Sequence, residues 1–180
     1  KGKALPSWRT ASPVIPMFFP KAITSGPKKN WRKLAHACGF PRCTVKEDKM
    51  IDLRTAYGEA LVQLGRQNDA VVVLDTDVGH HTGAHPFEKQ FPKRFFQLGV
   101  AEQNMMGVAA GLAACGLIAF PTCFAAFASK RAHDQVSISI AYTNLNVKIV
   151  GSYSGLSSAN TGATHQAIDD IATMRAMPNM

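Results

Sequence analysis

The chain has 180 residues, of which 46% are hydrophobic and 18% are charged, a composition typical of a globular domain with a buried core. No run approaches the roughly 18 apolar residues of a membrane span, so we expect no membrane partner. The net charge of +8 is unevenly distributed. Residues 1–49 hold 11 of the 20 Lys and Arg and 2 of the 12 Asp and Glu, which leaves 9 and 10 for residues 50–180. The near-neutral balance of the larger part argues against a nucleic-acid partner.

Residues 1–49 lack any sustained periodicity and are rich in proline, which interrupts both helices and sheets (Pro6, Pro13, Pro16, Pro20, Pro27 and Pro41). We expect this part to be a disordered or loosely attached basic extension, and the folded domain to cover residues 50–180. A basic, acid-poor leader is also typical of targeting peptides. The prediction is therefore a cytoplasmic protein, with organellar targeting left open, as is the presence of residues 1–49 in the mature protein.

The four cysteines show no disulfide spacing, which favours a reducing compartment. Three residues, His36, Cys38 and Cys43, could serve as zinc ligands, but a fourth ligand and the usual paired spacing are missing. We therefore predict no metal site in this chain.

From Leu53 onwards, helical and strand patterns alternate. Apolar residues at three- and four-residue spacing predict a helix from Leu53 to Leu64, ending at Gly65. The expected strands are Ala70–Leu74, Phe95–Leu98, Leu117–Pro121 and Val147–Val150, and the further helices are Pro86–Gln90, Ala101–Cys115, Ala128–Ala141 and Gln166–Met174. Such alternation predicts an α/β fold of three layers, a parallel sheet flanked by helices. The chain ends where another strand would follow, so we expect the domain to be cut short at its C-terminus.

The segment from Arg94 to Gly116 reads as a short strand, a glycine turn and a helix of small residues, with Glu102 in the first helical turn. An acid at this position complements the helix dipole. Because the helix is apolar almost all round, however, it should be buried. A carboxylate at the mouth of a buried helix, after a parallel strand, lies where open α/β sheets bind their ligands.

This segment contains Gly99-Val-Ala-Glu-Gln-Asn-Met followed by Gly107-Val-Ala-Ala-Gly-Leu-Ala. Further motifs, in order along the chain, are Arg54-Thr-Ala-Tyr-Gly-Glu-Ala-Leu, Val73-Leu-Asp-Thr-Asp, Phe91-Pro-Lys-Arg-Phe-Phe, Thr122-Cys-Phe-Ala-Ala-Phe, Asn144-Leu-Asn-Val-Lys-Ile-Val-Gly and Thr164-His-Gln-Ala-Ile-Asp-Asp-Ile-Ala. Together they resemble the pyrimidine-binding domain of the transketolase family, especially the C-terminal subunit of split transketolases. The resemblance implies the thiamine-diphosphate-binding fold over residues 50–180.

The resemblance also implies a set of cofactor-binding residues. Glu102 matches the catalytic glutamate that hydrogen-bonds the aminopyrimidine ring and so activates thiamine diphosphate. Phe127 matches a phenylalanine that stacks on the pyrimidine, and Phe124 one that walls its pocket. Asp77 matches an acid near the thiazolium ring.

On the substrate side, His165 matches a catalytic histidine that contacts the donor sugar, and Arg54 an arginine that binds the acceptor's phosphate. The family's Gly-Glu-Asp-Gly segment reads Ala159-Asn-Thr-Gly here, so Thr161 replaces an aspartate that helps select sugar stereochemistry. His81 stands where a serine would help to hold phosphate. The sugar phosphate specificity is therefore left open.

The family's diphosphate-binding motif, a Gly-Asp-Gly segment with a downstream Asn, is missing from this chain. The resemblance thus implies that a partner subunit or domain binds the diphosphate, with its Mg²⁺ or Ca²⁺, in a homo- or hetero-oligomer. By itself the chain is expected to be inactive.

The predicted function is the pyrimidine-binding part of a transketolase-like enzyme, which transfers a two-carbon ketol unit between sugar phosphates. Two alternatives stay open. One is a fragment of a deoxyxylulose-phosphate-synthase-like enzyme, which shares the Ala-Glu-Gln segment. The other is a truncated, non-catalytic paralogue that only pairs with a partner subunit.

Overall fold

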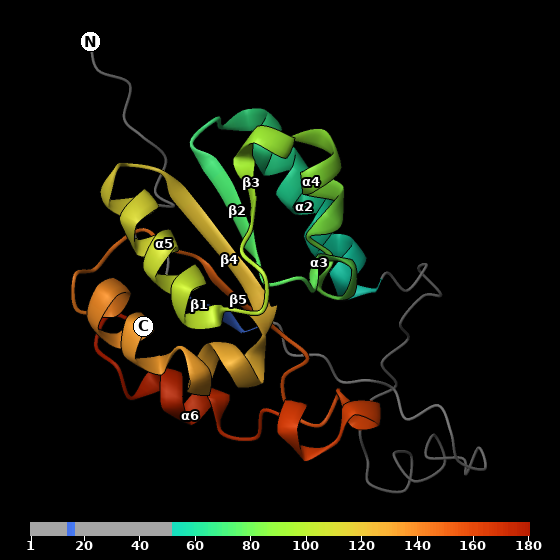
Figure 1. Ribbon diagram of the computed structural model, residues 1–180, viewed down its shortest axis with the longest axis vertical. Helices are drawn as coiled ribbons and strands as arrows, with labels where there is room; N and C mark the ends of the chain where they lie inside the picture. Colours follow the sequence, from blue (N-terminus) through green and yellow to red (C-terminus); the bar gives the residue numbers. More distant parts are fainter. Residues whose placement is uncertain (1–13, 17–51) are drawn as a thin grey trace, which may run out of the picture.

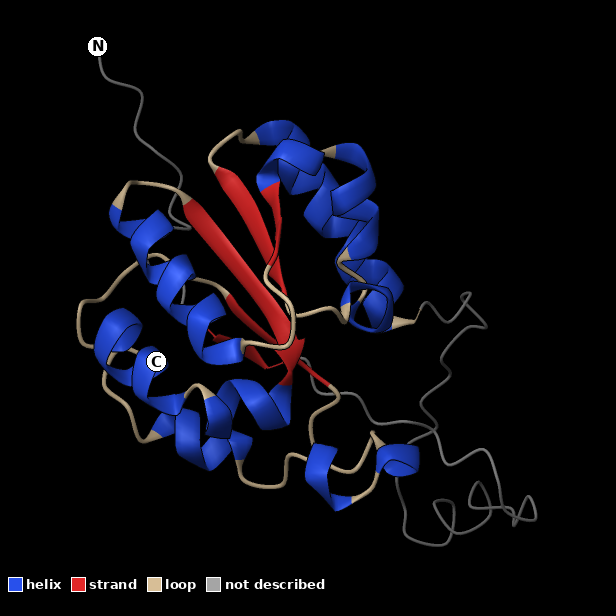
Figure 2. Ribbon diagram, viewed as in Figure 1, coloured by secondary structure: helices blue, strands red, loops and turns tan. Residues whose placement is uncertain are grey.

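The computed structural model describes residues 14–16, as backbone, and residues 52–180. Five parallel strands form one sheet in the order β1-β5-β4-β2-β3 (Figures 1 and 2). They are β1 (Val14–Pro16), β2 (Val71–Asp75), β3 (Phe95–Gln97), β4 (Ile118–Phe124) and β5 (Ile149–Ser152). The short β1 lies at the sheet edge, where a terminal proline is tolerated. The candidate zinc ligands lie outside the described residues.

Helices cover both faces of the sheet, so the predicted three-layer α/β fold is confirmed (Figure 2). The α-helices are α2 (Leu53–Gln67), α3 (Gly79–Thr82), α4 (His85–Gln90), α5 (Glu102–Ala114) and α6 (Asp170–Arg175). Shorter turns are η2 (Pro92–Arg94), η5 (Ala159–Thr161) and η6 (Ala163–His165), and two π-helical segments are η3 (Phe127–Arg131) and η4 (Gln135–Ala141). Helices α2 and α4 lie on one face, and α5 and η4 on the other (Figure 1). None of the helices between residues 52 and 180 is long and apolar enough to cross a bilayer.

Strand β2, which lies between β4 and β3, separates two hydrophobic cores. All five of its residues are buried, as expected for a strand covered on both faces. Because successive side chains point to opposite faces, Val72 and Leu74 pack into the core beneath α5, whereas Val71 and Val73 pack beneath α2 and α4.

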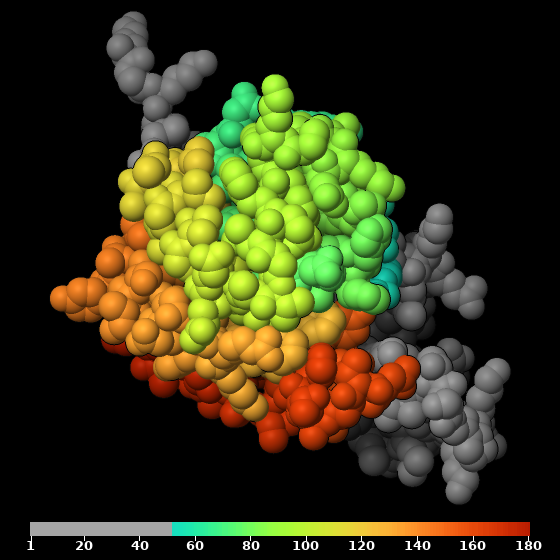
Figure 3. All heavy atoms as spheres, in the orientation of Figure 1, coloured from blue at the N-terminus to red at the C-terminus, as the bar shows by residue number. Residues whose placement is uncertain are grey.

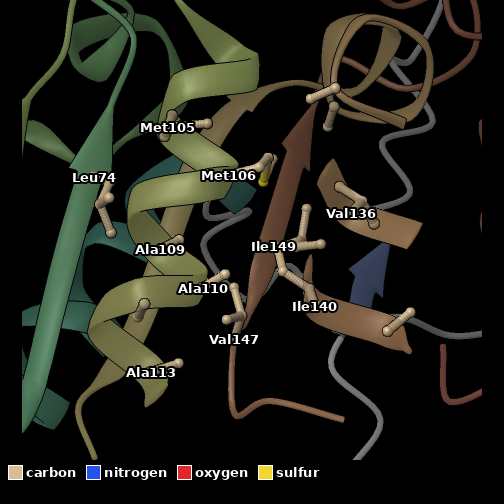
Figure 4. Close-up of a cluster of buried hydrophobic side chains, with 14 of the residues drawn as sticks. Leu74, Met105, Met106, Ala109, Ala110, Ala113, Val136, Ile140, Val147 and Ile149 are labelled. Atoms are coloured by element: carbon tan, nitrogen blue, oxygen red, sulfur yellow. The ribbon is translucent and has the colours of Figure 1, made fainter. Parts of the chain in front are cut away.

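Helix α5 packs closely because its buried face is made of small and flexible residues. Met105, Met106, Ala109, Ala110 and Ala113 face the sheet and η4 (Figure 4). The prediction of a buried helix here is confirmed, and its N-terminus is brought to the carboxyl ends of the strands.

Two predicted helix boundaries are wrong for identifiable reasons. Helix α2 does not stop at Gly65 but continues to Gln67. A Cβ at Gly65 would lie 2.5 Å from the Phe87 ring and 2.8 Å from the Phe91 ring, so glycine serves close packing here and not helix termination. The helix expected from Gln166 begins only at Asp170, because Gln166 is extended and Ala167 exchanges two backbone hydrogen bonds with Gly155, at 2.8 and 3.0 Å.

The segment predicted to be helical from Ala128 to Ala141 is helical, but mostly with the wide turns of a π-helix. These wide turns are η3 and η4, in which the Ala132 amide donates to the Phe127 carbonyl at 3.1 Å, an i→i+5 bond. Such wide turns occur frequently at functional sites.

Candidate active site

The carboxyl ends of β2, β3, β4 and β5 meet at one edge of the sheet, where parallel α/β folds bind ligands. A cleft of about 470 Å³ opens there. It is lined by Asp77, Val78, His81, Phe124, Tyr153, Ser157, Ser158, Ala159, Asn160 and Thr161. The lining combines an aromatic wall with hydroxyl, amide and ionisable groups, a composition suited to a small polar ligand.

Glu102 is the first residue of α5, and only 2% of its surface is exposed. Its Oε2 accepts a hydrogen bond of 2.9 Å from Nη1 of Arg131, so the two side chains form an ion pair. The preceding turn brings it there: Gly99 has φ +68°, and the Ala101 amide donates to the Gly99 carbonyl at 2.7 Å. The result is a buried carboxylate supported by a guanidinium and by the helix N-terminus.

Four rings form a continuous aromatic group, which Arg131 connects to this carboxylate because its Cζ lies 4.1 Å from the centroid of Phe127. Phe124 stacks on Phe127 with centroids 6.0 Å apart, and both meet the edge of His165 at 6.0 and 5.0 Å. Tyr153 meets Phe124 edge-on at 5.0 Å. The loop after β5 thus lies directly beside the segment after β4, as Figure 3 shows in orange-red and orange. The imidazole of His165 is oriented by a 2.8 Å contact between its Nδ1 and the Thr164 hydroxyl.

Asp77 lies on the cleft wall in a left-handed conformation, with φ +64°. The Gln97 side chain holds it, since its Oε1 accepts from the Asp77 amide at 2.9 Å and from the Gly99 amide at 3.1 Å. The Nε2 of Gln97 donates to Asp75 Oδ2 at 2.8 Å. One side chain therefore joins the loop that carries Asp77 to the loop that leads into Glu102.

Arg54 lies near the first turn of α2 and reaches the rim of the cleft. Its Nη1 donates to the Tyr153 hydroxyl at 2.8 Å, and its Nη2 lies 2.7 Å from Asp52 Oδ2. The hydrogen bond from Arg54 holds the pKa of Asp52 below its usual value, and the same bond raises the pKa of Arg54. The guanidinium stays charged and half exposed, available to an anion.

Thr161 does not reproduce the acidic group that the resemblance leads one to expect. Its hydroxyl bonds the Ser158 hydroxyl and donates to the Ser158 carbonyl at 2.7 Å. The side chain is therefore turned back onto its own loop, and the cleft has no carboxylate at this position.

The predicted residues lie around a common site. The structure brings Phe124, Phe127 and His165 into contact and connects Arg54 to them through Tyr153. Asp77 shares the cleft with Phe124 and Tyr153.

Three residues with a place in this site were missed. Tyr153 and Gln97 carry no spacing signal, because their roles depend on loops brought together only by the sheet. Arg131 follows Phe127 by four residues, a signal that could have placed it on the same side of a helix.

Comparison with known proteins decides the family. Residues 49–180 match the family model described as the transketolase, pyrimidine binding domain. The chain belongs to this family. A putative transketolase C-terminal section of Methanocaldococcus jannaschii is 50% identical over 128 residues, which cover 71% of this chain and 40% of that protein. The 6-deoxy-6-sulfo-D-fructose transketolase subunit SqwH of a Clostridium species is 45% identical over 128 residues, which again cover 71% of this chain and 40% of that protein.

Solved structures agree with this assignment. A structure described as a split gene transketolase, inactive beta4 tetramer, superposes with a TM-score of 0.64 and is 51% identical. The match covers 73% of this chain and 41% of that one. The chain thus spans about two fifths of the length of these three relatives.

Proposed function

We propose that this pyrimidine-binding domain supplies the activating carboxylate of a transketolase-like enzyme that transfers a two-carbon ketol unit between sugar phosphates. The observation that carries the proposal is Glu102, a carboxylate with 2% exposure at the N-terminus of a buried helix. Burying a carboxylate to this degree lowers the stability of the fold unless a partner group compensates for it. In this family the aminopyrimidine of thiamine diphosphate would be such a partner.

The residues present fit the aminopyrimidine half of thiamine diphosphate. Glu102 offers a buried carboxyl group that can share a proton with a ring nitrogen, and Phe127 offers a ring face that Arg131 connects to it. When bound, the cofactor supplies a carbanion that accepts and donates the ketol unit. Glu102 holds a proton in place at the ring nitrogen, and Phe124 and Phe127 exclude water from that side.

The opposite side of the cleft suits a phosphorylated sugar. Arg54 provides a guanidinium whose fork matches a phosphate, and Tyr153 holds it in position by their 2.8 Å hydrogen bond. His165, packed against Phe127, is placed to donate to or accept from a substrate hydroxyl. The neutral Thr161 makes discrimination among sugar hydroxyls weaker than an aspartate would.

A partner is needed to complete the cofactor site. Within the described residues, no group of three or more acidic, histidine or cysteine side chains could hold a metal ion. We therefore assign the diphosphate, with Mg²⁺ or Ca²⁺, to a diphosphate-binding subunit or domain that pairs with this chain, as in split transketolases.

The test is ketol transfer by the chain in complex with its diphosphate-binding subunit. A Glu102→Gln variant should lower turnover by a factor of about 10² to 10⁴, because the activating carboxylate is lost. Glu59→Gln, an exposed position on α2, is the matched control and should leave turnover unchanged. Native mass spectrometry checks that both variants still assemble. Unaltered turnover in Glu102→Gln would overturn the assignment.

A further inference from the structure

Under the proposed function, the aminopyrimidine of the cofactor contacts both Glu102 and the Phe127 ring. In this chain Arg131 makes both of these contacts. Its Nη1 donates to Glu102 Oε2 at 2.9 Å, and its Cζ lies 4.1 Å from the centroid of the Phe127 ring. A guanidinium is planar and carries nitrogen donors in its plane, as the aminopyrimidine ring does. We propose that Arg131 is a placeholder for this ring, which pairs Glu102 until the cofactor displaces it. The inference rests on the proposed function.

The segment η3 carries both Phe127 and Arg131. Its wide turn closes with the i→i+5 bond from the Ala132 amide to the Phe127 carbonyl, at 3.1 Å. In a turn of this width, residues four apart lie on the same side of the segment. Arg131 is therefore placed over the ring of Phe127 and reaches past it to Glu102.

The two side chains of the ion pair differ in solvent exposure. The Arg131 side chain is 46% exposed, whereas that of Glu102 is 2% exposed. The guanidinium can turn outward and be hydrated, because its long stem already reaches solvent. Glu102 cannot move with it, since it is anchored in the first turn of α5 above buried Met105 and Met106. Arg131 is therefore the residue that moves when the cofactor binds.

A placeholder would stabilise the chain before the shared site is assembled. A buried carboxylate without a partner is strongly destabilising, and the ring that would pair it is absent before assembly. Arg131 supplies the missing partner, at the cost of competing with the ring. If the contact is made in nine tenths of the molecules, the apparent affinity for the ring falls by roughly tenfold.

The neighbouring cation does not share this role. Lys130 Nζ lies 3.0 Å from Asp169 Oδ1, so Lys130 ties η3 to the segment before α6. The two adjacent basic residues thus make separate ion pairs. Lys130 therefore provides a matched control for the loss of one positive charge from η3.

The test is titration of thiamine diphosphate, by calorimetry, into the chain assembled with its diphosphate-binding subunit. Arg131→Met keeps the apolar stem and removes the guanidinium, and we expect it to bind thiamine diphosphate about tenfold more tightly than wild type. Lys130→Met should bind within a factor of about two of wild type. Unchanged or weaker binding by Arg131→Met, with wild type binding normally, would overturn the placeholder role alone.

A second readout needs no cofactor. Thermal unfolding of the full chain is compared for Arg131→Met, Glu102→Gln and the double variant. We expect Arg131→Met to lower the Tm by about 5 °C in the wild-type background and by much less when Glu102→Gln is present. Equal shifts in both backgrounds would show that the two residues are not coupled. Failure of every protein to bind thiamine diphosphate would instead contradict the proposed function, and with it the displacement step.

Discussion

The two sides of the candidate site are built differently. The side that carries Glu102 is anchored in the core beneath α5, where Met105, Met106 and Ala109 are fully buried. The other side is the loop from Tyr153 to Gln166, which is held by short turns and by hydroxyl contacts such as that of Ser157 with the Ser154 carbonyl. A side chain anchored in the core keeps its place, whereas a loop tolerates substitution. We therefore propose that the side that carries Glu102 serves the cofactor chemistry and that the loop side serves substrate choice.

The largest expected effect is a loss of stability on the side that carries Glu102. Met106→Ala should lower the free energy of unfolding by about 2–5 kcal/mol, because it removes a fully buried side chain one turn after Glu102. Leu156→Ala, on the opposite loop and 65% exposed, should change it by less than about 0.5 kcal/mol. Urea unfolding of both variants measures the difference. Similar losses would remove the distinction between the two sides.

The next effect concerns the connection between loops on the side that carries Glu102. Gln97→Met removes the bonds to Asp75, Asp77 and Gly99, and leaves the 1% exposed Asp75 carboxylate with fewer partners. We expect a loss of about 1–3 kcal/mol in unfolding free energy. Hydrogen exchange should also quicken at the Asp77 amide. Unchanged protection there would show that Gln97 does not hold the loop.

A smaller effect is expected where Arg54 joins the loop side. Tyr153→Phe removes the 2.8 Å bond to Arg54 but keeps the edge contact with Phe124. The unfolding free energy should fall by about 0.5–1.5 kcal/mol. Affinity for a sugar phosphate should fall more than affinity for the unphosphorylated sugar, and equal losses would separate Arg54 from phosphate binding.

Thr161→Asp sharpens the comparison by restoring the acid typical of the family. Because Thr161 is exposed, stability should change by no more than about 0.5 kcal/mol. Selectivity among ketose phosphates of different hydroxyl configuration should rise when turnover is compared in the complex. An unchanged ratio of turnover between these substrates would show that residue 161 does not contribute to sugar selectivity.

The smallest effect is a pH dependence at the N-cap of α2. The pKa of Asp52 is lowered by its hydrogen bond with Arg54, so its charge stabilises the fold above about pH 4, and this contribution is lost as the pH falls. Asp52→Asn keeps a capping side chain and should cost only a few tenths of a kcal/mol at pH 7. The difference from wild type should vanish in acid, and a difference that grows there would contradict this account.

How much the sequence predicts also differs between the two sides. The strands and α5 were predicted because buried elements carry long apolar patterns, and Glu102 was found within such a pattern. The start of the helix expected from Gln166 was wrong, because Gln166 is extended and Ala167 pairs with Gly155, a contact between segments that no local pattern records. Tyr153 and Gln97 act through contacts between segments distant in sequence, which no local pattern records. For Arg131 the four-residue spacing from Phe127 is a local signal, whereas its pair with Glu102 is not.

The most direct test of the central claim is a structure of the chain assembled with its diphosphate-binding subunit and thiamine diphosphate. We expect a pyrimidine nitrogen within hydrogen-bond distance of the Glu102 carboxylate, the Phe127 ring beneath the pyrimidine, and Arg131 turned away from both. A pyrimidine bound elsewhere, with the Arg131–Glu102 pair intact, would contradict the account.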